Sequence, residues 1–118
     1  MPGTATGTAP DLMPGADPFD ALGDPTRREI LRLLSEGDKP VHAIADALPI
    51  SRPAVSRHLR LLKDAGLVDE RAEGNRRIYH LEGGGPGMQV VRDYLEGVWG
   101  EAAARFRLFA ENTAPPPP

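Results

Sequence analysis

The stretch that decides the fold is SRPAVSRHLRLLKDAGLV, residues 51–68. Ser51 can cap the N-terminus of a helix, and Pro53 is tolerated in the first turn. Gly66 favours the left-handed backbone conformation that ends a helix. The apolar residues between these signals recur at helical spacing and define one face: Val55, Leu59, Leu62 and, beside them, Leu61. The stretch therefore predicts a helix over residues 52–65 whose apolar face packs on the preceding elements.

A shorter helix is predicted directly upstream, before Pro49, which prevents its continuation. Its apolar residues also repeat at helical spacing: Val41, Ile44, Ala45 and Leu48. Two short helices joined by a tight turn form the skeleton of a helix-turn-helix. This pairing places residues 52–65 in the second position, which is the position of a DNA-reading helix.

An earlier helix is predicted to begin at Asp24 and Pro25, because Asp is a good N-cap and Pro suits the first helical position. Gly37 and Asp38 predict its end. Its apolar residues lie on one side and its arginines largely on the other: Ile30, Leu31 and Leu34 against Arg27, Arg28 and Arg32. Residues 19–22 indicate a short helical turn before it.

Two short strands are predicted after the second helix of the motif, over residues 67–72 and 77–81. Between them, Gly74 and Asn75 supply a turn that tolerates positive φ. A hairpin in this place is a wing. The predicted fold class is therefore mostly α with a small β-hairpin wing, a winged helix-turn-helix.

The last long helix is predicted over residues 88–112, after a flexible break at residues 83–87. It carries an apolar stripe, widened by Tyr94 and Trp99, whose members are Val91, Leu95, Val98, Ala102, Phe106 and Phe109. The stripe either folds back on its own domain or pairs with a second copy. We favour a homodimer, because the earlier elements already close a core and burying the stripe contributes on the order of 10 kcal/mol gross. The glycines at positions 97 and 100 mark either a close approach of two backbones or a kink.

The outward face of the helix over residues 52–65 carries the chemistry that suits duplex DNA. Arginine offers paired donors that match the two major-groove acceptors of guanine, and serine hydroxyls suit phosphate. Because only the first two turns of such a helix normally enter the groove, we expect contacts near the bases from Ser51, Arg52, Pro53, Ser56 and Arg57, with Arg60 on the backbone. The alternative is a solvated basic helix face.

Three further residues are candidates for contact with DNA. Arg76 and Arg77 lie at the end of the hairpin turn, where long cations reach flanking phosphates or a narrow minor groove. Strand alternation requires at most one of them to face DNA, and the alternative is that both keep a sheet edge soluble. His58 lies inside the reading helix, placed either to donate to a phosphate or to pack.

The net charge of −3 is unevenly distributed. Residues 1–50 hold 4 Lys and Arg against 8 Asp and Glu, residues 51–80 hold 7 against 4, and residues 81–118 hold 3 against 5. The basic excess is thus confined to the middle of the chain, and the local field rather than the total charge steers a polyanion. The distribution is compatible with binding to DNA.

The composition limits the domain boundaries and argues against several other classes of protein. Residues 1–17 are expected to form a disordered tail and residues 113–118 a Pro-rich extended tail, which leaves residues 18–112 as the domain. With no cysteine and no histidine pair at ligand spacing, we predict no metal site and no cofactor. No catalytic signature is present, so we expect no enzyme activity. No apolar run spans a bilayer and no signal peptide is evident, so we expect a soluble cytoplasmic protein without a membrane partner.

Two segments resemble the ArsR/SmtB winged-helix repressors of bacteria: FDALGDPTRREILRLL, residues 19–34, and IADALPISRPAVSRHLRLLKDAGLVDERAEGNRRIYHL, residues 44–81. The resemblance implies that the first and last helices form the dimer interface, which adds Phe19 and Leu22 to the stripe. It also implies that residues 52–65 enter the major groove. Metal-sensing members carry cysteines where this chain has Pro40 and His42, or use His on the last helix, where this chain has none. We therefore predict that metal sensing is absent.

The leading hypothesis is a homodimeric repressor that binds a palindromic operator, with its two reading helices about 34–36 Å apart. One alternative is a winged helix for protein–protein assembly, whose basic face docks on an acidic partner. Another is a small-molecule-responsive regulator whose ligand lies between the last helix and the core. Nothing in the sequence identifies that effector.

Overall fold

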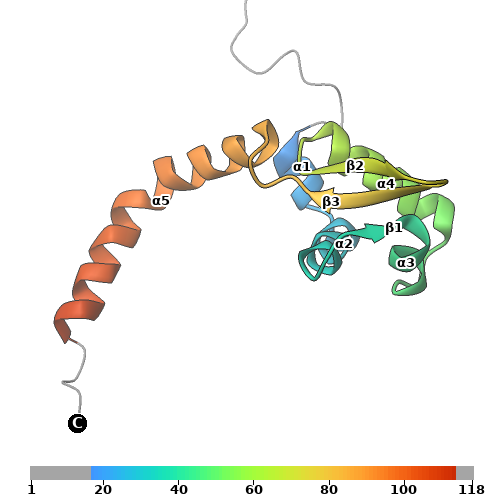
Figure 1. The fold of residues 1–118 in the computed structure, drawn as a ribbon. Helices are drawn as coiled ribbons and strands as arrows, with labels where there is room; N and C mark the ends of the chain where they lie inside the picture. The colour runs from blue at the N-terminus through green and yellow to red at the C-terminus, as the bar shows by residue number, and fades with distance from the viewer. Residues whose placement is uncertain (1–16, 114–118) are drawn as a thin grey trace, which may run out of the picture.

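The structure, a computed structural model, describes residues 17–113. The tails expected over residues 1–17 and 113–118 lie outside this range, apart from their inner end residues. Five helices and three strands follow one another within it: α1 Pro18–Leu22, α2 Pro25–Ser35, β1 Lys39–Pro40, α3 Val41–Asp46, α4 Arg52–Asp64, β2 Val68–Glu73, β3 Arg76–Leu81 and α5 Pro86–Thr113. The mostly helical fold with a small wing is confirmed (Figure 1).

The helix starts predicted from the sequence are confirmed by side-chain caps. The Asp24 carboxylate accepts hydrogen bonds from the backbone N–H groups of Thr26 at 2.8 Å and Arg27 at 3.1 Å. The Ser51 hydroxyl accepts one from the N–H of Ala54 at 3.3 Å. These caps satisfy backbone donors that have no partner inside the helix, so they fix where α2 and α4 begin.

The core lies where α2, α3, α4 and the start of the hairpin meet. Its largest fully buried side chains come from each of these elements: Ile30, Ile44, Val55, Leu59, Leu62 and Val68. They include the face predicted for residues 52–65, which is confirmed. Burying this face directs the opposite side of α4 to solvent.

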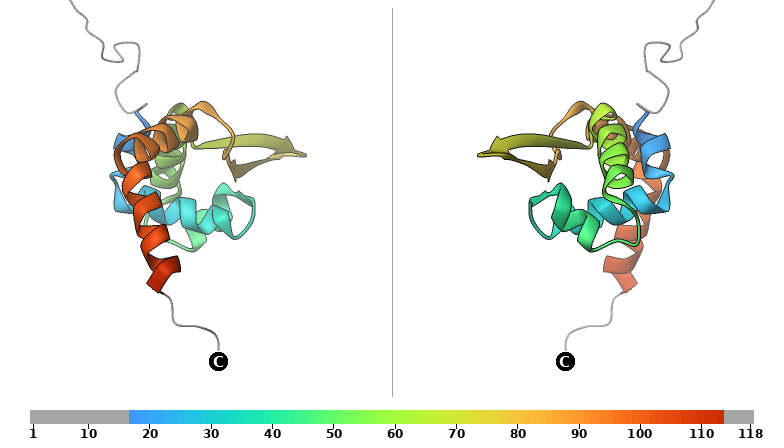
Figure 2. Two further views of the ribbon diagram at one scale, coloured as in Figure 1. Left: turned by 90° about the vertical axis from the view of Figure 1, so that its left-hand side faces the viewer. Right: turned by 90° about the vertical axis from the view of Figure 1, so that its right-hand side faces the viewer.

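The sheet has three strands, in the order β1-β3-β2, rather than the two that the sequence predicted. The third strand is β1, whose Lys39 lies opposite Tyr79 and whose Pro40 lies opposite Ile78. Strands β2 and β3 are joined by the expected glycine turn, in which Gly74 has φ +62°. Figures 1 and 2 show this hairpin standing away from the helices as a wing.

Only the end of the segment expected to be a flexible break, residues 83–87, is packed against the end of α4. Gly83 and Gly84 are exposed with open space around them, whereas Gly87 is buried. A Cβ at Gly87 would lie 2.1 Å from the carbonyl oxygen of Ala65, and one at Gly66 would lie 2.8 Å from the nitrogen of Gly87. The backbone N–H of Glu82 donates to the carbonyl of Leu67 at 3.0 Å. Helix α5 begins at Pro86, two residues before its predicted start, so this close approach of the two backbones falls within its first turn.

Helix α5 runs as one helix through Gly97 and Gly100. We call the part of the structure from α1 to β3 the winged body. Figure 1 shows α5 leaving this body on the side opposite the tip of the wing and bending along its length. Its contacts with the body are chiefly with α1. No helix within residues 17–113 combines the length and the apolar character needed to cross a membrane.

Candidate nucleic-acid interface

The outward face of α4 presents the residues that the sequence singled out. Six of them are exposed, at the N-cap of α4 or along its first nine residues: Ser51, Arg52, Pro53, Ser56, Arg57 and Arg60. Within residues 17–113, the guanidinium groups of Arg52, Arg57 and Arg60 make no hydrogen bond or ion pair, so they remain available to an external anion. Rigid positioning of free donors is what groove recognition requires.

His58 lies on a different side of α4 from these residues. It is half-buried, and its Nδ1 lies 3.3 Å from Nη1 of Arg27 on α2. Arg27 in turn donates through Nε to the carbonyl of Ala21 at 3.0 Å. Of the two roles open to His58, packing against α2 is the one this geometry favours. Arg27, expected on the solvent side of α2, instead ties α1, α2 and α4 together.

The two arginines of the wing differ in their surroundings. Their positions in the register, Arg76 opposite Glu73 and Arg77 opposite Ala72, direct them to opposite faces of the hairpin. Arg77 faces α4, where its Nη1 lies 3.2 Å from Oε2 of Glu70. Arg76 is exposed and makes no ion pair among the described residues. Only Arg76 therefore carries a free charge at the wing tip.

A polar cleft of about 600 Å³ separates α4 from the wing. At its base, the Glu70 carboxylate accepts a hydrogen bond from Lys63 Nζ at 2.9 Å. This bond raises the pKa of Lys63, and burial is the main cause that raises the pKa of Tyr79 beside it. The cleft is lined by Ser56, Leu59, Arg60, Lys63, Asp64, Glu70, Arg77 and Tyr79.

The sequence did not single out Glu70 or Tyr79. The strand register would reveal them. Glu70 lies directly opposite Tyr79, and Arg77, two residues before Tyr79 in β3, lies on the same face of the hairpin. That signal is readable only once the turn length is known, because a slip of one residue reverses every side chain.

The apolar stripe of α5 is largely uncovered. Leu95, Val98, Trp99, Ala102, Phe106 and Phe109 are all exposed, with Trp99 at 53% and Phe106 at 71%. Phe19 of α1 joins them through an edge-to-face contact with Tyr94, with ring centroids 5.1 Å apart. Val90 and Leu108, which the sequence did not place in the stripe, are exposed as well.

Two predicted interface residues are placed differently. Val91 is buried within its own protomer, on the part of α5 nearest to the body. Leu22 is half-buried beneath α5, where it lines a cavity. Both therefore contribute to packing within the protomer.

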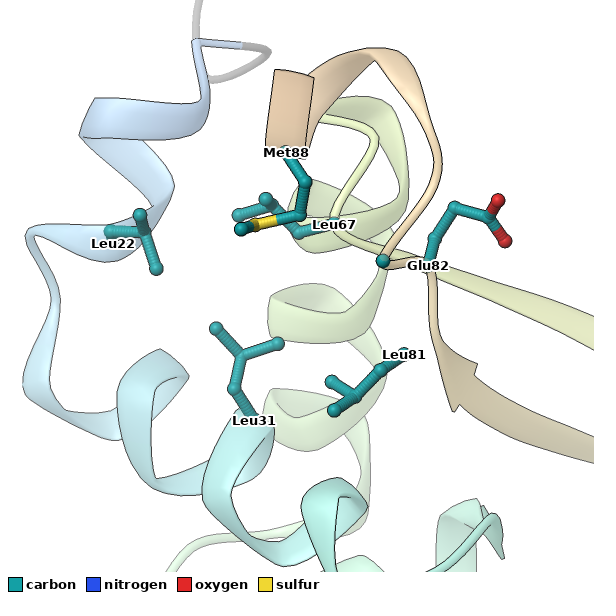
Figure 3. Close-up of a pocket in the computed structure, with 7 residues that line it drawn as sticks. Leu22, Leu31, Leu67, Leu81, Glu82 and Met88 are labelled. Atoms are coloured by element: carbon teal, nitrogen blue, oxygen red, sulfur yellow. The ribbon is translucent and has the colours of Figure 1, made fainter. Parts of the chain in front are cut away.

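That cavity has a volume of about 250 Å³ and lies between the terminal helices and the winged body (Figure 3). Its lining is almost entirely apolar and comes from Leu22, Leu31, Leu67, Leu81 and Met88, with Glu82 and Gly83. Figure 3 shows the Glu82 carboxylate directed away from the leucines that face one another. The interior is suited to uncharged apolar groups.

No cluster of three or more His, Asp or Glu side chains within residues 17–113 is arranged to hold a metal ion. The arrangement instead combines a rigid helix with free arginines, a wing beside it and an uncovered apolar helix. These features define a winged helix-turn-helix of the nucleic-acid-binding class.

Comparison with known proteins identifies the family. Residues 24–70 match the family described as "Bacterial regulatory protein, arsR family". The chain is 44% identical over 94 residues to the HTH-type transcriptional regulator Rv2034 of Mycobacterium tuberculosis, covering 80% of this chain and 86% of that protein. The chain therefore belongs to the ArsR family and is a transcriptional regulator with a DNA-binding winged helix-turn-helix domain.

Two further relatives are informative. The chain is 43% identical over 63 residues to the transcriptional repressor SdpR of Bacillus subtilis, covering 53% of this chain and 70% of the repressor. It is also similar to the solution structure of a homodimeric winged helix-turn-helix DNA-binding domain from Mycobacterium bovis. That domain is described as a possible ArsR-family regulator, with a TM-score of 0.57 and 34% identity over 79% of this chain and 94% of that one.

Proposed function

We propose that the chain is a homodimeric repressor that binds a palindromic operator in the bacterial cytoplasm, with one α4 helix in each major groove. Residues 18–112 act as a single domain for both DNA binding and dimerisation. The observation that carries the proposal is the set of free guanidinium groups on α4, held rigid by a fully buried opposite face.

The residues of α4 and the wing take different roles in this proposal. Arg52 and Arg57, with Ser51, Pro53 and Ser56 around them, lie near base edges, because they occupy the first two turns. Arg60 and the wing-tip Arg76 contact phosphates, which position the protein without reading sequence. His58 is left out of the set because it faces Arg27.

Dimerisation is proposed to occur through α5 and α1. Large apolar side chains exposed in a row mark an interaction surface rather than a solvated one. Trp99, Phe106 and Phe19 supply the aromatic area that dominates such interfaces. The relative from Mycobacterium bovis, described as homodimeric, supports the same assembly here. Repression follows from occupying a promoter, and the relative named a repressor supports that direction.

Two substitutions separate base reading from phosphate binding. Arg57→Ala is expected to weaken binding to the specific site by about 1–3 kcal/mol and to relax specificity there, whereas Arg76→Ala weakens binding to all duplexes evenly and lowers the salt slope by about 1. Arg105→Ala, which removes a cation from α5 instead, is the control. Affinities for the selected operator and for random duplex check both. Equal losses on every sequence from both substitutions would refute these roles.

The salt dependence of DNA affinity distinguishes DNA binding from the protein–protein alternative. If several phosphates are neutralised, affinity for random duplex falls by orders of magnitude between about 50 and about 200 mM salt. A protein that binds no duplex even at about 50 mM salt supports docking on an acidic partner instead.

A second candidate function, response to a small molecule, is favoured by the apolar cavity. The cavity is lined by residues of α1 and α5 and by Leu81 at the base of the wing. A bound ligand would therefore contact the helices proposed to form the dimer and the strand that positions the wing. An apolar cavity of about 150 Å³ is known to hold benzene, so one of this size suits a compact uncharged hydrocarbon-like ligand. Toluene is the probe: it should raise the unfolding temperature of the wild type but not of Leu22→Phe, which fills the cavity. No shift in the wild type counts against this function.

A further inference from the structure

Glu70 is an acid held between the reading helix and the wing. Its side chain, on β2, is only 15% exposed, and its Oε2 lies 2.9 Å from Lys63 Nζ and 3.2 Å from Arg77 Nη1. Its other oxygen, Oε1, is buried and has no hydrogen-bond partner among residues 17–113. An unpaired buried acceptor costs free energy, so attraction to the two cations must hold the carboxylate in this place.

The carboxylate is an anion at neutral pH. The hydrogen bond from Lys63 is the largest influence on the pKa of Glu70 and lowers it, and the neighbouring Tyr79 and Arg77 side chains lower it further, against the opposing effect of burial. Lys63 and Arg77 are therefore both paired with one internal negative charge that does not titrate near pH 7, and the three groups together keep a net charge of about +1.

The two cations are nevertheless reachable from outside. Lys63 and Arg77 are both exposed, and both line the cleft that also contains Ser56 and Arg60, two of the residues proposed to contact DNA. A phosphate that enters the cleft meets these cations from the open side, while Glu70 meets them from the base. Phosphate and carboxylate thus compete for the same donors.

We propose that Glu70 is a specificity-determining residue, an internal anion that withholds Lys63 and Arg77 from DNA phosphates. Phosphate contacts strengthen binding to every sequence alike, whereas base contacts discriminate between sequences. Withholding two cations in each subunit lowers sequence-independent affinity and leaves discrimination to the free arginines of α4. The inference rests on the proposed DNA-binding function.

Glu70→Gln tests the proposal because it keeps the shape of the side chain and removes its charge. The measurement is affinity for random duplex DNA at several salt concentrations. The slope of log K against log salt should steepen by about 0.9 for each cation that gains a phosphate, up to about 3.6 for the four cations of a dimer. At about 50 mM salt, affinity for random duplex should rise at least tenfold, while the ratio of specific to random affinity falls.

Asp69→Asn is the matched control. It makes the same change of net charge at the preceding residue of β2, which points to the other face of the hairpin and forms no ion pair with Lys63 or Arg77 among the described residues. Its slope should change by less than one phosphate contact. An equal effect of Asp69→Asn and Glu70→Gln would overturn the proposal, because the long-range field alone would then explain both.

Lys63→Gln in the otherwise wild-type chain gives a test that does not depend on the folding of Glu70→Gln. Because Lys63 is already withheld, this change should leave the slope unaltered, whereas a slope lower by about 0.9 per subunit would overturn the proposal. So would a folded Glu70→Gln protein, checked by thermal unfolding, whose slope is unchanged. Failure of the wild type to bind any duplex at low salt would instead overturn the proposed function.

Discussion

The winged body buries its large apolar side chains, whereas helix α5 exposes most of its own. In the body, Leu59 is 0% exposed and lies among residues from α2, α3 and the hairpin. Along α5, Trp99 and Phe106 are more exposed than buried. The body is thus complete within one chain, whereas α5 carries apolar surface that one chain does not cover. The proposed dimer accounts for this difference: the body folds within one chain, and a second copy covers the apolar side chains of α5.

The largest expected effect is in the body. Leu59→Ala should destabilise the domain by about 2–5 kcal/mol, because it removes buried methyl groups and leaves a cavity. Denaturant unfolding at two protein concentrations measures this loss. The same loss at both concentrations assigns it to the protomer, and a loss that disappears at high concentration would break the contrast between body and α5.

The next effect is on α5. Trp99→Ala should weaken dimerisation by roughly 2–4 kcal/mol, as expected for a central aromatic residue of an interface. It should leave the far-ultraviolet spectrum of the body unchanged. Sedimentation equilibrium gives the dimer dissociation constant, with Glu101→Ala, roughly opposite on the helix, as control. If Trp99→Ala lowers stability without changing that constant, Trp99 belongs to the protomer core.

A third effect tests the junction between the two regions. Gly87→Ala should cost about 1–3 kcal/mol, because its Cβ would overlap the carbonyl oxygen of Ala65 and force α5 away from α4. Gly97→Ala, where nothing lies within 4 Å of the added Cβ, is the control and should be neutral or stabilising. Thermal unfolding of the two variants measures the contrast. Equal stability of both would show that the junction is loose.

The smallest effect is at the start of α2. Asp24→Ala should cost about 1 kcal/mol through loss of the N-cap. Hydrogen bonding by the backbone N–H of Arg27 lowers the pKa of Asp24 below its ordinary 3.8. A lowered folded-state pKa stabilises above the unfolded value, and this stabilisation is lost as pH falls through the folded value. The difference between wild type and Asp24→Ala should therefore be constant from pH 5 to 7 and shrink below about pH 4. A difference that grows in acid would contradict the cap.

Signals confined to one turn of chain predicted much of this fold. The caps at Asp24 and Ser51 depend on atoms two or three residues away, and the left-handed Gly66 depends on its own backbone. The apolar face of α4 depends only on helical period. Each is readable from the sequence because the partners are close along the chain.

Features that need partners far along the chain were missed. Strand β1 exists only because Lys39 meets Tyr79, and the packing of Gly87 depends on Ala65. The same holds for Arg27 against His58, and for the pairing of Glu70 with Lys63 and Arg77. Counting charges along residues 51–80 gave the net excess of cations, but it could not show that two of these cations share the Glu70 carboxylate.

The most direct measurement is the number of chains bound to one operator duplex, determined by sedimentation of the wild type with and without DNA. We expect the free protein to sediment at twice the mass of the 118-residue chain and to bind as one dimer for each palindromic site. A single chain that is monomeric when free and occupies its site alone would contradict pairing through α5 and, with it, the proposed reading of a palindrome.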